Sequence, residues 1–234
     1  MSSSVVLVTG VTGFVGPWLV RALRASSAAI HGVGPESGTE LPLDGWHIAD
    51  VREREALEAA IAAAQPDAVI HLAGQSSAAL SFEQPAETFT INAGGTWNLL
   101  EALRRRAPRA RILVVGTSEV YGPQPEGSRV AEDAAFRPVS PYALSKAVAD
   151  ALTEIHGKHN ALDAVRTRSF GHTGPGQTSR FVLPAFAEQI ALIEAGQAEP
   201  VLRVGNLEVT REFLDVRDVV QAYAALLARG LGGQ

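Results

Sequence analysis

The stretch TGVTGFVG at residues 9–16 decides the fold. It follows the apolar run VVLV at residues 5–8 and precedes a segment with apolar residues at helical spacing. Gly10 permits a tight turn, Gly13 lets the backbone approach a pyrophosphate, and Gly16 lets helix and strand pack closely. The helix N-terminus then offers free N–H groups and a positive dipole end to the anion. A glycine triplet also serves ordinary turns, but its position between a strand and a helix predicts a dinucleotide-binding loop.

Short β-branched runs alternate with longer runs rich in Ala and Leu along the rest of the chain. We expect strands at 5–8, 28–33, 46–49, 68–72, 111–115 and 164–168, and helices at 14–25, 53–64, 89–106, 141–158, 181–195 and 216–228. This alternation implies βαβ units and a parallel sheet, and strands that are apolar on both faces are typical of a sheet covered on two sides. The pattern predicts an α/β fold, a doubly wound parallel sheet of the Rossmann type.

The chain divides into three expected parts. Residues 1–170 form a dinucleotide-binding Rossmann domain that carries the catalytic residues, 171–215 a substrate-binding segment, and 216–234 a helix that returns to the Rossmann domain. Because the sequence ends just after that helix with no closing strand, we expect the small C-terminal substrate-binding part to be incomplete.

Composition excludes several classes of protein. Of 234 residues, 46% are hydrophobic and 19% charged, which is ordinary for a globular protein. The net charge of −5 argues against general nucleic-acid binding, and the run Arg104–Arg106 complements the dipole at a helix end instead. The absence of Cys excludes disulfides and thiolate metal sites. With no apolar run of the ~20 residues that span a bilayer and no basic leader, we expect a cytoplasmic protein without a bound metal ion or a membrane partner.

Two further loops suit the same dinucleotide. Asp50-Val51 follows the third strand, where a carboxylate accepts from an adenine amino group; Asp50 with Glu53 also fits a helix capping box, and both roles remain open. Leu72-Ala73-Gly74 follows the fourth strand, and its small residues let the backbone pass close to a ribose or phosphate. His71, which ends that strand, is interpreted as a half-buried core histidine. Beyond the second strand, Glu36 follows a proline, so the choice between NAD and NADP stays open.

The stretch SPYALSK at residues 140–146 indicates catalysis. Ser140 suits an N-cap, and Tyr142 and Lys146 then lie four apart on one helix face. An ammonium near a phenol lowers its pKa from about 10, which suits a tyrosine that exchanges a proton with a carbonyl. Thr117 and Glu119 follow the strand at 111–115, at the carboxyl edge where ligands bind in open parallel sheets. The alternative is an incidental Tyr/Lys pair on a solvated face.

These residues resemble the extended short-chain dehydrogenases/reductases, the NAD-dependent epimerase/dehydratase family. The resemblance covers essentially the whole chain, through TGVTGFVG (9–16), HLAGQSS (71–77), NAGGTWNLLEA (92–102), GTSEVYG (116–122) and SPYALSK (140–146). It implies a Thr117/Tyr142/Lys146 triad, Asn92 as a support for the site, and Lys146 as a ligand of the nicotinamide ribose. It also implies a homodimer through the helices at 89–106 and 141–158.

The second half is similar to GDP-4-keto-6-deoxy-mannose reductases. The similar stretches are TRSFGHTGPGQ (167–177), FVLPAFAEQI (181–190), VGNLE (204–208) and REFLDVRD (211–218). In that family the corresponding loops hold the nucleotide and diphosphate, so Arg180 and Arg211 are candidates to bind phosphate oxygens, with surface charge as the alternative. Gly171 stands where the family usually has Asn, and Gly74 replaces a usual Ala.

The expected site has three groups of residues. The catalytic group is Thr117, Glu119, Tyr142 and Lys146. The substrate group is Ser118, Glu119, His172, Arg180 and Arg211. The cofactor group is Gly10, Gly13, Phe14, Val15, Gly16, Asp50, Val51, Leu72, Ala73, Gly74, Asn92, Tyr142, Lys146 and Phe170.

The resemblance favours NAD(P)H-dependent reduction of the C4 keto group of GDP-4-keto-6-deoxy-mannose to GDP-6-deoxy-mannose (GDP-rhamnose). Tyr142 would give the proton, and Thr117 would orient the carbonyl. The alternatives are a GDP-mannose 4,6-dehydratase, in which Glu119 helps to eliminate water, or another nucleotide-sugar epimerase/dehydratase. A different class, a non-catalytic NAD(P)-binding sensor, is disfavoured because Tyr142 and Lys146 are both present. The sequence leaves open the base, the sugar and whether the chain continues after Gln234.

Overall fold

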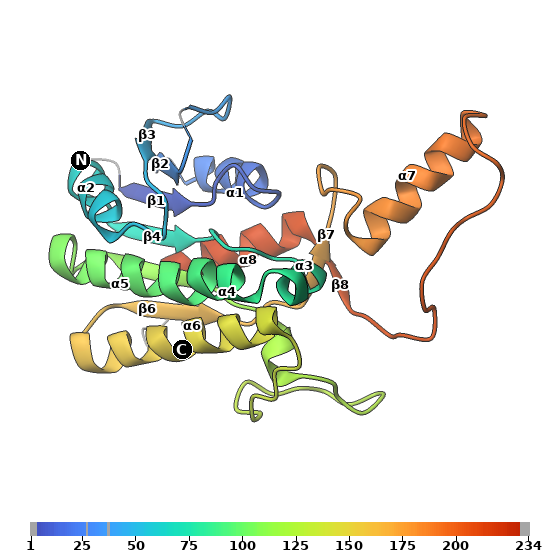
Figure 1. The fold of residues 1–234 in the computed structure, drawn as a ribbon. Coiled ribbons are helices and arrows are strands. Elements are labelled where there is room, and N and C mark those ends of the chain that lie inside the picture. The colour runs from blue at the N-terminus through green and yellow to red at the C-terminus, as the bar shows by residue number, and fades with distance from the viewer. Residues whose placement is uncertain (1–3, 27, 37, 230–234) are drawn as a thin grey trace.

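A six-stranded parallel sheet forms the centre of the molecule in the computed structural model, which describes residues 4–26, 28–36 and 38–229 (Figure 1). Its order is β3-β2-β1-β4-β5-β6. The bounds are β1 (Val5–Thr9), β2 (Ala29–Gly34), β3 (Gly45–Ile48), β4 (Ala68–His71), β5 (Arg111–Val115) and β6 (Ala164–Thr167). The strand order reverses between β1 and β4, which is where dinucleotides bind in doubly wound folds. The predicted fold class is confirmed.

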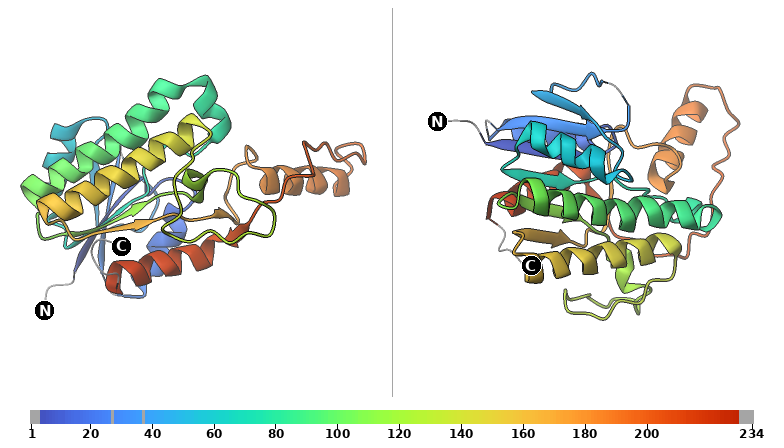
Figure 2. Two further views of the ribbon diagram at one scale, coloured as in Figure 1. Left: turned by 90° about the horizontal axis from the view of Figure 1, so that it is seen from below. Right: turned by 60° about the vertical axis from the view of Figure 1, so that its left-hand side comes forward.

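Helices cover both faces of this sheet (Figure 2). The helical elements are α1 (Gly16–Arg24), α2 (Arg54–Ala64), α3 (Ala78–Glu83), α4 (Pro85–Phe89), the π-helical turn η1 (Thr90–Gly94), α5 (Gly95–Arg106), the 3-10 turn η2 (Ser118–Tyr121), α6 (Pro141–Asn160), α7 (Val182–Glu194) and α8 (Val216–Arg229). The single helix expected at 89–106 was wrong in part, because the π-helical turn at residues 90–94 interrupts it. The short helix α3 was not expected.

Alternate residues of the central strands enter two apolar cores. Leu7 and Val69 lie in one core with residues of α2 and α5, whereas Val8 and Ile70 lie in the other with residues of α1 and α8. Because both faces are buried, the strands lack the apolar/polar alternation of a half-exposed sheet, as the sequence indicated. The cores fix the strand ends that carry the candidate site.

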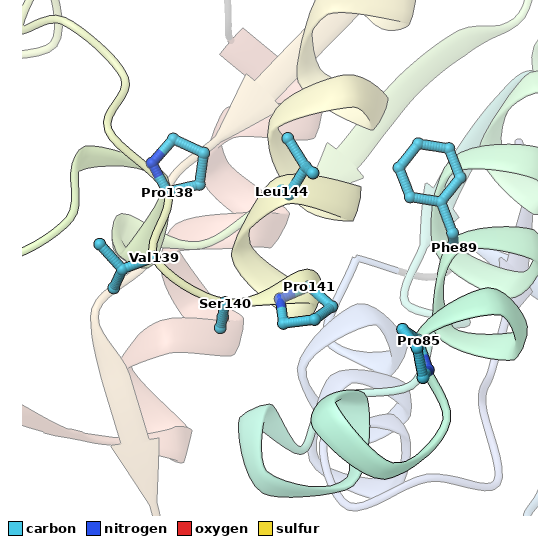
Figure 3. Close-up of a pocket in the computed structure, with 7 residues that line it drawn as sticks. All are labelled: Pro85, Phe89, Pro138, Val139, Ser140, Pro141 and Leu144. Atoms are coloured by element: carbon cyan, nitrogen blue, oxygen red, sulfur yellow. The ribbon is translucent and has the colours of Figure 1, made fainter.

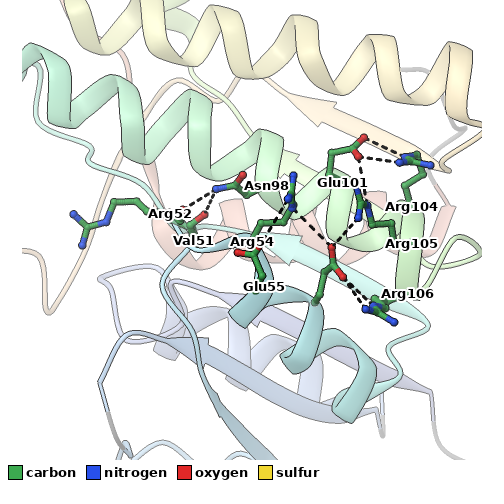
Figure 4. A network of polar contacts seen from close by, with 10 residues as sticks. Val51, Arg52, Arg54, Glu55, Asn98, Glu101, Arg104, Arg105 and Arg106 are labelled. Atoms are coloured by element: carbon green, nitrogen blue, oxygen red, sulfur yellow. Dashed lines mark hydrogen bonds and ion pairs between the residues drawn. The ribbon is translucent and has the colours of Figure 1, made fainter.

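Charged residues tie α2 to α5 at the far end from that site (Figure 4). Glu58 of α2 pairs with Arg106 of α5 at 2.9 Å, and within α5 Glu101 pairs with Arg104 at 2.9 Å. The arginine run at 104–106 ends a helix, as expected. It also pairs with carboxylates, which was not predicted from the sequence.

A second, two-stranded parallel sheet, β7 (Gly171–Thr173) with β8 (Phe213–Asp215), joins the body to an arm. The arm contains α7 and the long connection that follows it, and Figure 1 shows both extending away from the six-stranded sheet. No residue of α7 is buried within the described structure. The chain then returns through β8 into α8, which packs on α1 and β5. No described helix is long and apolar enough to cross a membrane.

Candidate active site

The glycine turn after β1 brings the first and fourth strand ends together. Gly10 has a φ of +69°, and a Cβ there would lie 2.6 Å from the backbone nitrogen of Ala73. A Cβ at Gly16 would overlap the carbonyl oxygen of Val11. Both positions therefore require glycine, Gly10 for the turn and Gly16 for the tight start of α1. Gly13 has more room, since its Cβ would meet only the Gly10 oxygen, at 3.2 Å.

The end of α1 that faces this turn has no internal cap. Val15 occupies the N-cap position without a side-chain hydrogen bond, and the first turn of α1 carries no acidic residue. Within residues 4–26, 28–36 and 38–229, the backbone N–H groups of Phe14 and Val15 have no hydrogen-bond partner. Free N–H groups at a positive helix end fit the pyrophosphate of NAD(P).

The loop after β4 is held against this turn by hydroxyl and imidazole groups. The Ala73 N–H donates to Thr9 Oγ1 at 3.3 Å, and the same hydroxyl lies 2.7 Å from His71 Nδ1. His71 Nε2 lies 3.1 Å from Thr96 Oγ1, and burial lowers the pKa of His71 to about 3. His71 is therefore a neutral core residue, as interpreted, although it is fully buried and not half-buried. Leu72 and Gly74 flank Ala73 in this loop.

Asn92 joins the same loop to α6. Its Oδ1 accepts from the Gln75 N–H at 2.8 Å, and its Nδ2 donates to Gln75 O at 3.0 Å and to Ser145 Oγ at 2.9 Å. Its Oδ1 would also lie 2.9 Å from a Cβ at Gly74, so an alanine at that position would crowd the amide. Asn92 lies within η1, and π-helical turns are frequent at functional sites.

The capping box expected between Asp50 and Glu53 is wrong. Glu53 is itself the N-cap of α2, without a side-chain hydrogen bond, and Asp50 lies outside the helix. The Asp50 carboxylate instead accepts from the backbone N–H of Arg52 at 2.8 Å and from its guanidinium at 2.6 Å. These hydrogen bonds lower the pKa of Asp50. Val51 beside it is buried, and its carbonyl accepts from Asn98 at 3.1 Å.

Tyr142 lies in the first turn of α6, which Ser140 caps by accepting from the Ala143 N–H at 3.0 Å. Burial raises the pKa of Tyr142 to about 12, opposed by a hydrogen bond with Thr117. This direction is opposite to the sequence expectation, since desolvation of the phenol dominates over any nearby ammonium. Tyr142 is thus a protonated phenol in contact with the threonine that follows β5.

Lys146 follows one turn later on α6 and is buried. Its Nζ donates to the Val115 carbonyl at 2.6 Å and would lie 3.9 Å from a Cβ at Gly74. Burial lowers the pKa of Lys146 to about 8. The ammonium therefore lies between the end of β5 and the loop after β4, at the carboxyl edge of the sheet.

Glu119 and Arg211 interact electrostatically near Tyr142, without an ion pair within 4 Å among the described residues. Desolvation raises the pKa of Glu119, while the charge of Arg211 acts in the opposite direction. Arg211 is exposed, with a hydrogen bond to the Thr210 carbonyl at 3.1 Å. Ser118 precedes Glu119, and its N–H donates to the Ser169 carbonyl at 2.9 Å. Arg180, also exposed, has no hydrogen bond or ion pair among the described residues.

The start of the substrate-binding segment packs against the glycine turn. The rings of His172 and Phe14 stack with centroids 6.4 Å apart, and His172 Nδ1 lies 3.1 Å from the Phe170 carbonyl. Trp18 of α1 donates from Nε1 to the Pro175 carbonyl at 3.2 Å. His172 thus contacts the cofactor loop in this structure.

Sequence reasoning missed three groups that hold the site. They are the Val115 carbonyl, Gln75 and Ser145. A backbone carbonyl leaves no signal in a sequence, whereas Gln75 and Ser145 lie inside the two motifs quoted above and were passed over as filler between the expected residues.

Comparison with known proteins gives a consistent match. The model of the "NAD dependent epimerase/dehydratase family" matches residues 6–234. GDP-6-deoxy-D-mannose reductase of Pseudomonas aeruginosa is 39% identical over 97% of this chain and 71% of its own length. GDP-mannose 4,6-dehydratase of Vibrio cholerae is 30% identical over 94% of this chain and 63% of its own length.

Solved structures agree with these sequence matches. The structure of RMD from Pseudomonas aeruginosa complexed with NADPH superposes with a TM-score of 0.87 at 36% identity, over 99% of this chain and 75% of that one. UDP-glucose 4-epimerase from Thermus thermophilus in complex with NAD gives 0.85 at 30% identity, over 96% of this chain and 75% of that one.

Proposed function

The chain belongs to the NAD dependent epimerase/dehydratase family, and from this premise we propose that it reduces the C4 keto group of GDP-4-keto-6-deoxy-mannose. It is an NAD(P)-dependent short-chain oxidoreductase that acts on nucleotide sugars. The similarity to GDP-6-deoxy-D-mannose reductase, at 39% identity over nearly the whole chain, carries the choice of reductase. The product would be GDP-6-deoxy-mannose.

Tyr142 is the proposed proton donor. Because its pKa is raised to about 12, the phenol carries its proton at neutral pH and can give it to the carbonyl oxygen of the sugar. Thr117, whose hydroxyl acts to lower the pKa of Tyr142, is proposed to donate to the same oxygen and orient it. NAD(P)H, when bound, would supply the hydride that the carbonyl carbon requires.

Lys146 is proposed to stabilise the phenolate that remains. One of its three N–H groups is used by the Val115 carbonyl, which leaves the others for a ribose hydroxyl or for water beside the phenolate. Without bound ligands, burial disfavours the charged ammonium and lowers the pKa of Lys146. A phenolate close by would favour the charged form again.

The proposed cofactor contacts lie at the carboxyl edge of the sheet, in the loops after β1, β3, β4 and β6. The free N–H groups at Phe14 and Val15 suit the pyrophosphate, and Ala73 and Gly74 offer backbone that can lie close to a ribose. The Asp50 carboxylate accepts four hydrogen-bond contacts from Arg52, so an adenine amino group would bind it by replacing one of them. The remaining proposed cofactor contacts are the apolar residues Val51, Leu72 and Phe170. Asn92 supports the loop after β4 through its hydrogen bonds to Gln75 and Ser145.

The substrate contacts are proposed on the opposite side. Ser118 and Glu119 lie beside the catalytic groups, and Arg211 and Arg180 offer guanidinium groups for the diphosphate. His172 would contribute through its ring edge, since one ring face stacks on Phe14.

Cofactor stoichiometry tests this function. With GDP-4-keto-6-deoxy-mannose, we expect oxidation of NADPH or NADH in a one-to-one ratio with loss of the keto sugar. Turnover of GDP-mannose without net change in cofactor would identify a dehydratase instead, and tight cofactor binding without hydride transfer to any keto sugar would identify a sensor.

We also propose a homodimer through the exposed face of α5 and α6. A groove lined by Pro85, Phe89, Val139 and Leu144 opens between α4 and the start of α6 (Figure 3), and Trp97 and Leu152 line a second groove further along. Large apolar patches of this kind mark interfaces. Sedimentation of Leu144→Glu against the unmodified protein tests it; a monomer in both would refute the dimer.

The three-part division of the chain also remains a proposal. Its support is that α8 packs on α1 and β5, whereas the segment between β7 and β8 carries the exposed arm.

A further inference from the structure

Tyr223 is a buried phenol that the proposed reaction does not use. It lies on α8, with 2% of its surface exposed, among the apolar residues between α8 and the sheet. Its hydroxyl lies 2.7 Å from Ser169 Oγ. A phenylalanine would fill the same apolar space, so the hydroxyl adds one specific contact to this core at the cost of burying a polar group.

Ser169 connects this contact to the loop that carries Thr117. The Ser169 carbonyl accepts from the Ser118 N–H at 2.9 Å, and the Thr167 carbonyl accepts from the Gly116 N–H at 2.9 Å. A Cβ at Gly116 would overlap the Thr167 oxygen, so the backbones of the two segments lie directly against each other. The position of Thr117 therefore depends on where residues 167–169 lie.

The same strand ends also hold Lys146. Its Nζ bonds to the Val115 carbonyl, and Val115 is the sheet partner of Thr167. Thr167 Oγ1 is buried without a partner of ordinary geometry, yet Thr167 and Ser169 together lower the pKa of Tyr223, which burial raises. The phenol hydroxyl thus bonds to Ser169, two residues beyond the end of β6, and acts electrostatically with Thr167 as well.

We propose that Tyr223 is a positioning residue for the reaction: its hydroxyl holds Ser169, and through the Ser169 carbonyl it fixes the Gly116–Glu119 loop that presents Thr117 to the substrate. The inference rests on the proposed role of Thr117. It links the last helix, which follows the substrate-binding segment directly, to the geometry of the catalytic groups. A hydroxyl that merely satisfied Ser169 within the core would leave the loop unaffected.

Hydrogen exchange tests the link from Tyr223 to the Gly116–Glu119 loop without relying on enzyme activity. Tyr223→Phe removes only the hydroxyl, and Ser169→Ala removes its partner. We expect both to raise the exchange rate of peptides spanning residues 116–122 several-fold, on the order of five, the factor of one lost hydrogen bond. Thr153→Val is the matched control, because its buried hydroxyl bonds only within α6, to Ala149 O at 2.7 Å. It should leave those peptides unchanged.

Kinetics then separate positioning from packing. Tyr223→Phe should lower kcat by about the same factor and leave the KM for NADPH unchanged, and adding Ser169→Ala should bring no further loss, because both variants break one contact. Exchange at 116–122 equal to that of the unmodified protein, or additive losses, would overturn the proposal. If Tyr223→Phe does not fold, Ser169→Ala gives the same readouts. Tyr223→Phe could raise exchange at residues 116–122 while the unmodified protein reduces no keto sugar. That result would overturn the reductase function and, with it, the positioning role.

Discussion

The two sides of the candidate cleft are held in different ways. On the catalytic side, Thr117, Tyr142 and Lys146 are buried, and each contacts a neighbouring strand end or side chain. On the other side, the arm between β7 and β8 has no buried residue in α7, and its connection at residues 201–212 is exposed. The positions of the catalytic side chains are therefore fixed by the core of the chain. The groups proposed to recognise the substrate are not held by that core.

Few contacts join the two sides. Among the described residues they include the stack of His172 on Phe14, the hydrogen bond from Trp18 to the Pro175 carbonyl and the electrostatic effect of Arg211 on Glu119. An arm with so few contacts becomes ordered only when the substrate binds, and the entropy lost in that ordering lowers the affinity for the substrate. We therefore expect variants on the catalytic side to lose rate and stability. Variants in the arm should lose substrate affinity instead.

The largest expected effect is on the rate. Tyr142→Phe removes the proposed proton donor, and we expect kcat to fall by about 10³-fold, within the range of general acid catalysis. Binding of NADPH, measured by fluorescence titration, should change less than about threefold, since hydride donor and phenol act in separate roles. Tyr121→Phe is the control: it removes another buried hydroxyl, which donates to Glu132 O and accepts from Arg168 Nη1. Comparable losses in both variants would contradict the role of Tyr142.

The second effect is on folding and cofactor binding. Gly16→Ala forces a Cβ onto the Val11 carbonyl, where the backbone cannot yield without moving the turn. We expect a loss of about 3 kcal/mol in the free energy of unfolding, as for overpacked or strained sites, with NADPH binding weakened at least about tenfold. Gly205→Ala in the arm places a Cβ in open space and should change stability by less than about 0.5 kcal/mol. Urea unfolding and titration compare the two; equal effects would remove the contrast between the sides.

The same contrast explains what the sequence could predict. The glycine turn and the Tyr142–Lys146 spacing were predictable because backbone sterics and helix periodicity are local. The capping role of Asp50 was wrong, since Arg52 two residues later competes for its carboxylate. The direction of the Tyr142 pKa was wrong because burial, a tertiary property, exceeds the influence of the neighbouring lysine. The contacts of Val115 O and Tyr223 depend on which strands become neighbours, so no single stretch of sequence encodes them.

A third effect should appear in substrate affinity. Arg211→Ala removes the guanidinium that acts on Glu119 and is proposed to bind the diphosphate. We expect the KM for the GDP sugar to rise about tenfold, the loss of one charge-assisted hydrogen bond, with kcat and the KM for NADPH nearly unchanged. Arg129→Ala, an exposed arginine in the loop before α6, is the control. A fall in kcat with constant KM would place Arg211 in the chemistry instead of recognition.

The smallest effect concerns the energy stored on the catalytic side. In the cofactor-free protein, burial lowers the pKa of Lys146 from 10.5 to about 8, so the folded state bears an unfavourable ammonium at every pH below about 8. That cost decreases as pH rises from about 8 and vanishes above about 10.5, where both states are neutral. Lys146→Met should therefore raise the free energy of unfolding at pH 7, although the enzyme loses activity. A shift of this size corresponds to about 3 kcal/mol at most, and loss of the Val115 hydrogen bond offsets much of it, leaving about 1 kcal/mol.

Urea unfolding of the cofactor-free protein at several pH values checks the sign. The advantage of Lys146→Met should be largest near pH 7 and should disappear or reverse by about pH 10.5, because the unmodified protein then no longer buries a charge. Lys158→Met is the matched control: Lys158 is exposed and pairs with Glu154, so its replacement should change stability by less than about 1 kcal/mol, without this alkaline dependence. A stability difference for Lys146→Met that stays constant with pH would mean that the ammonium is not strained in the folded protein. The catalytic side would then resemble the arm, with its charge solvated and its position set only when ligands bind.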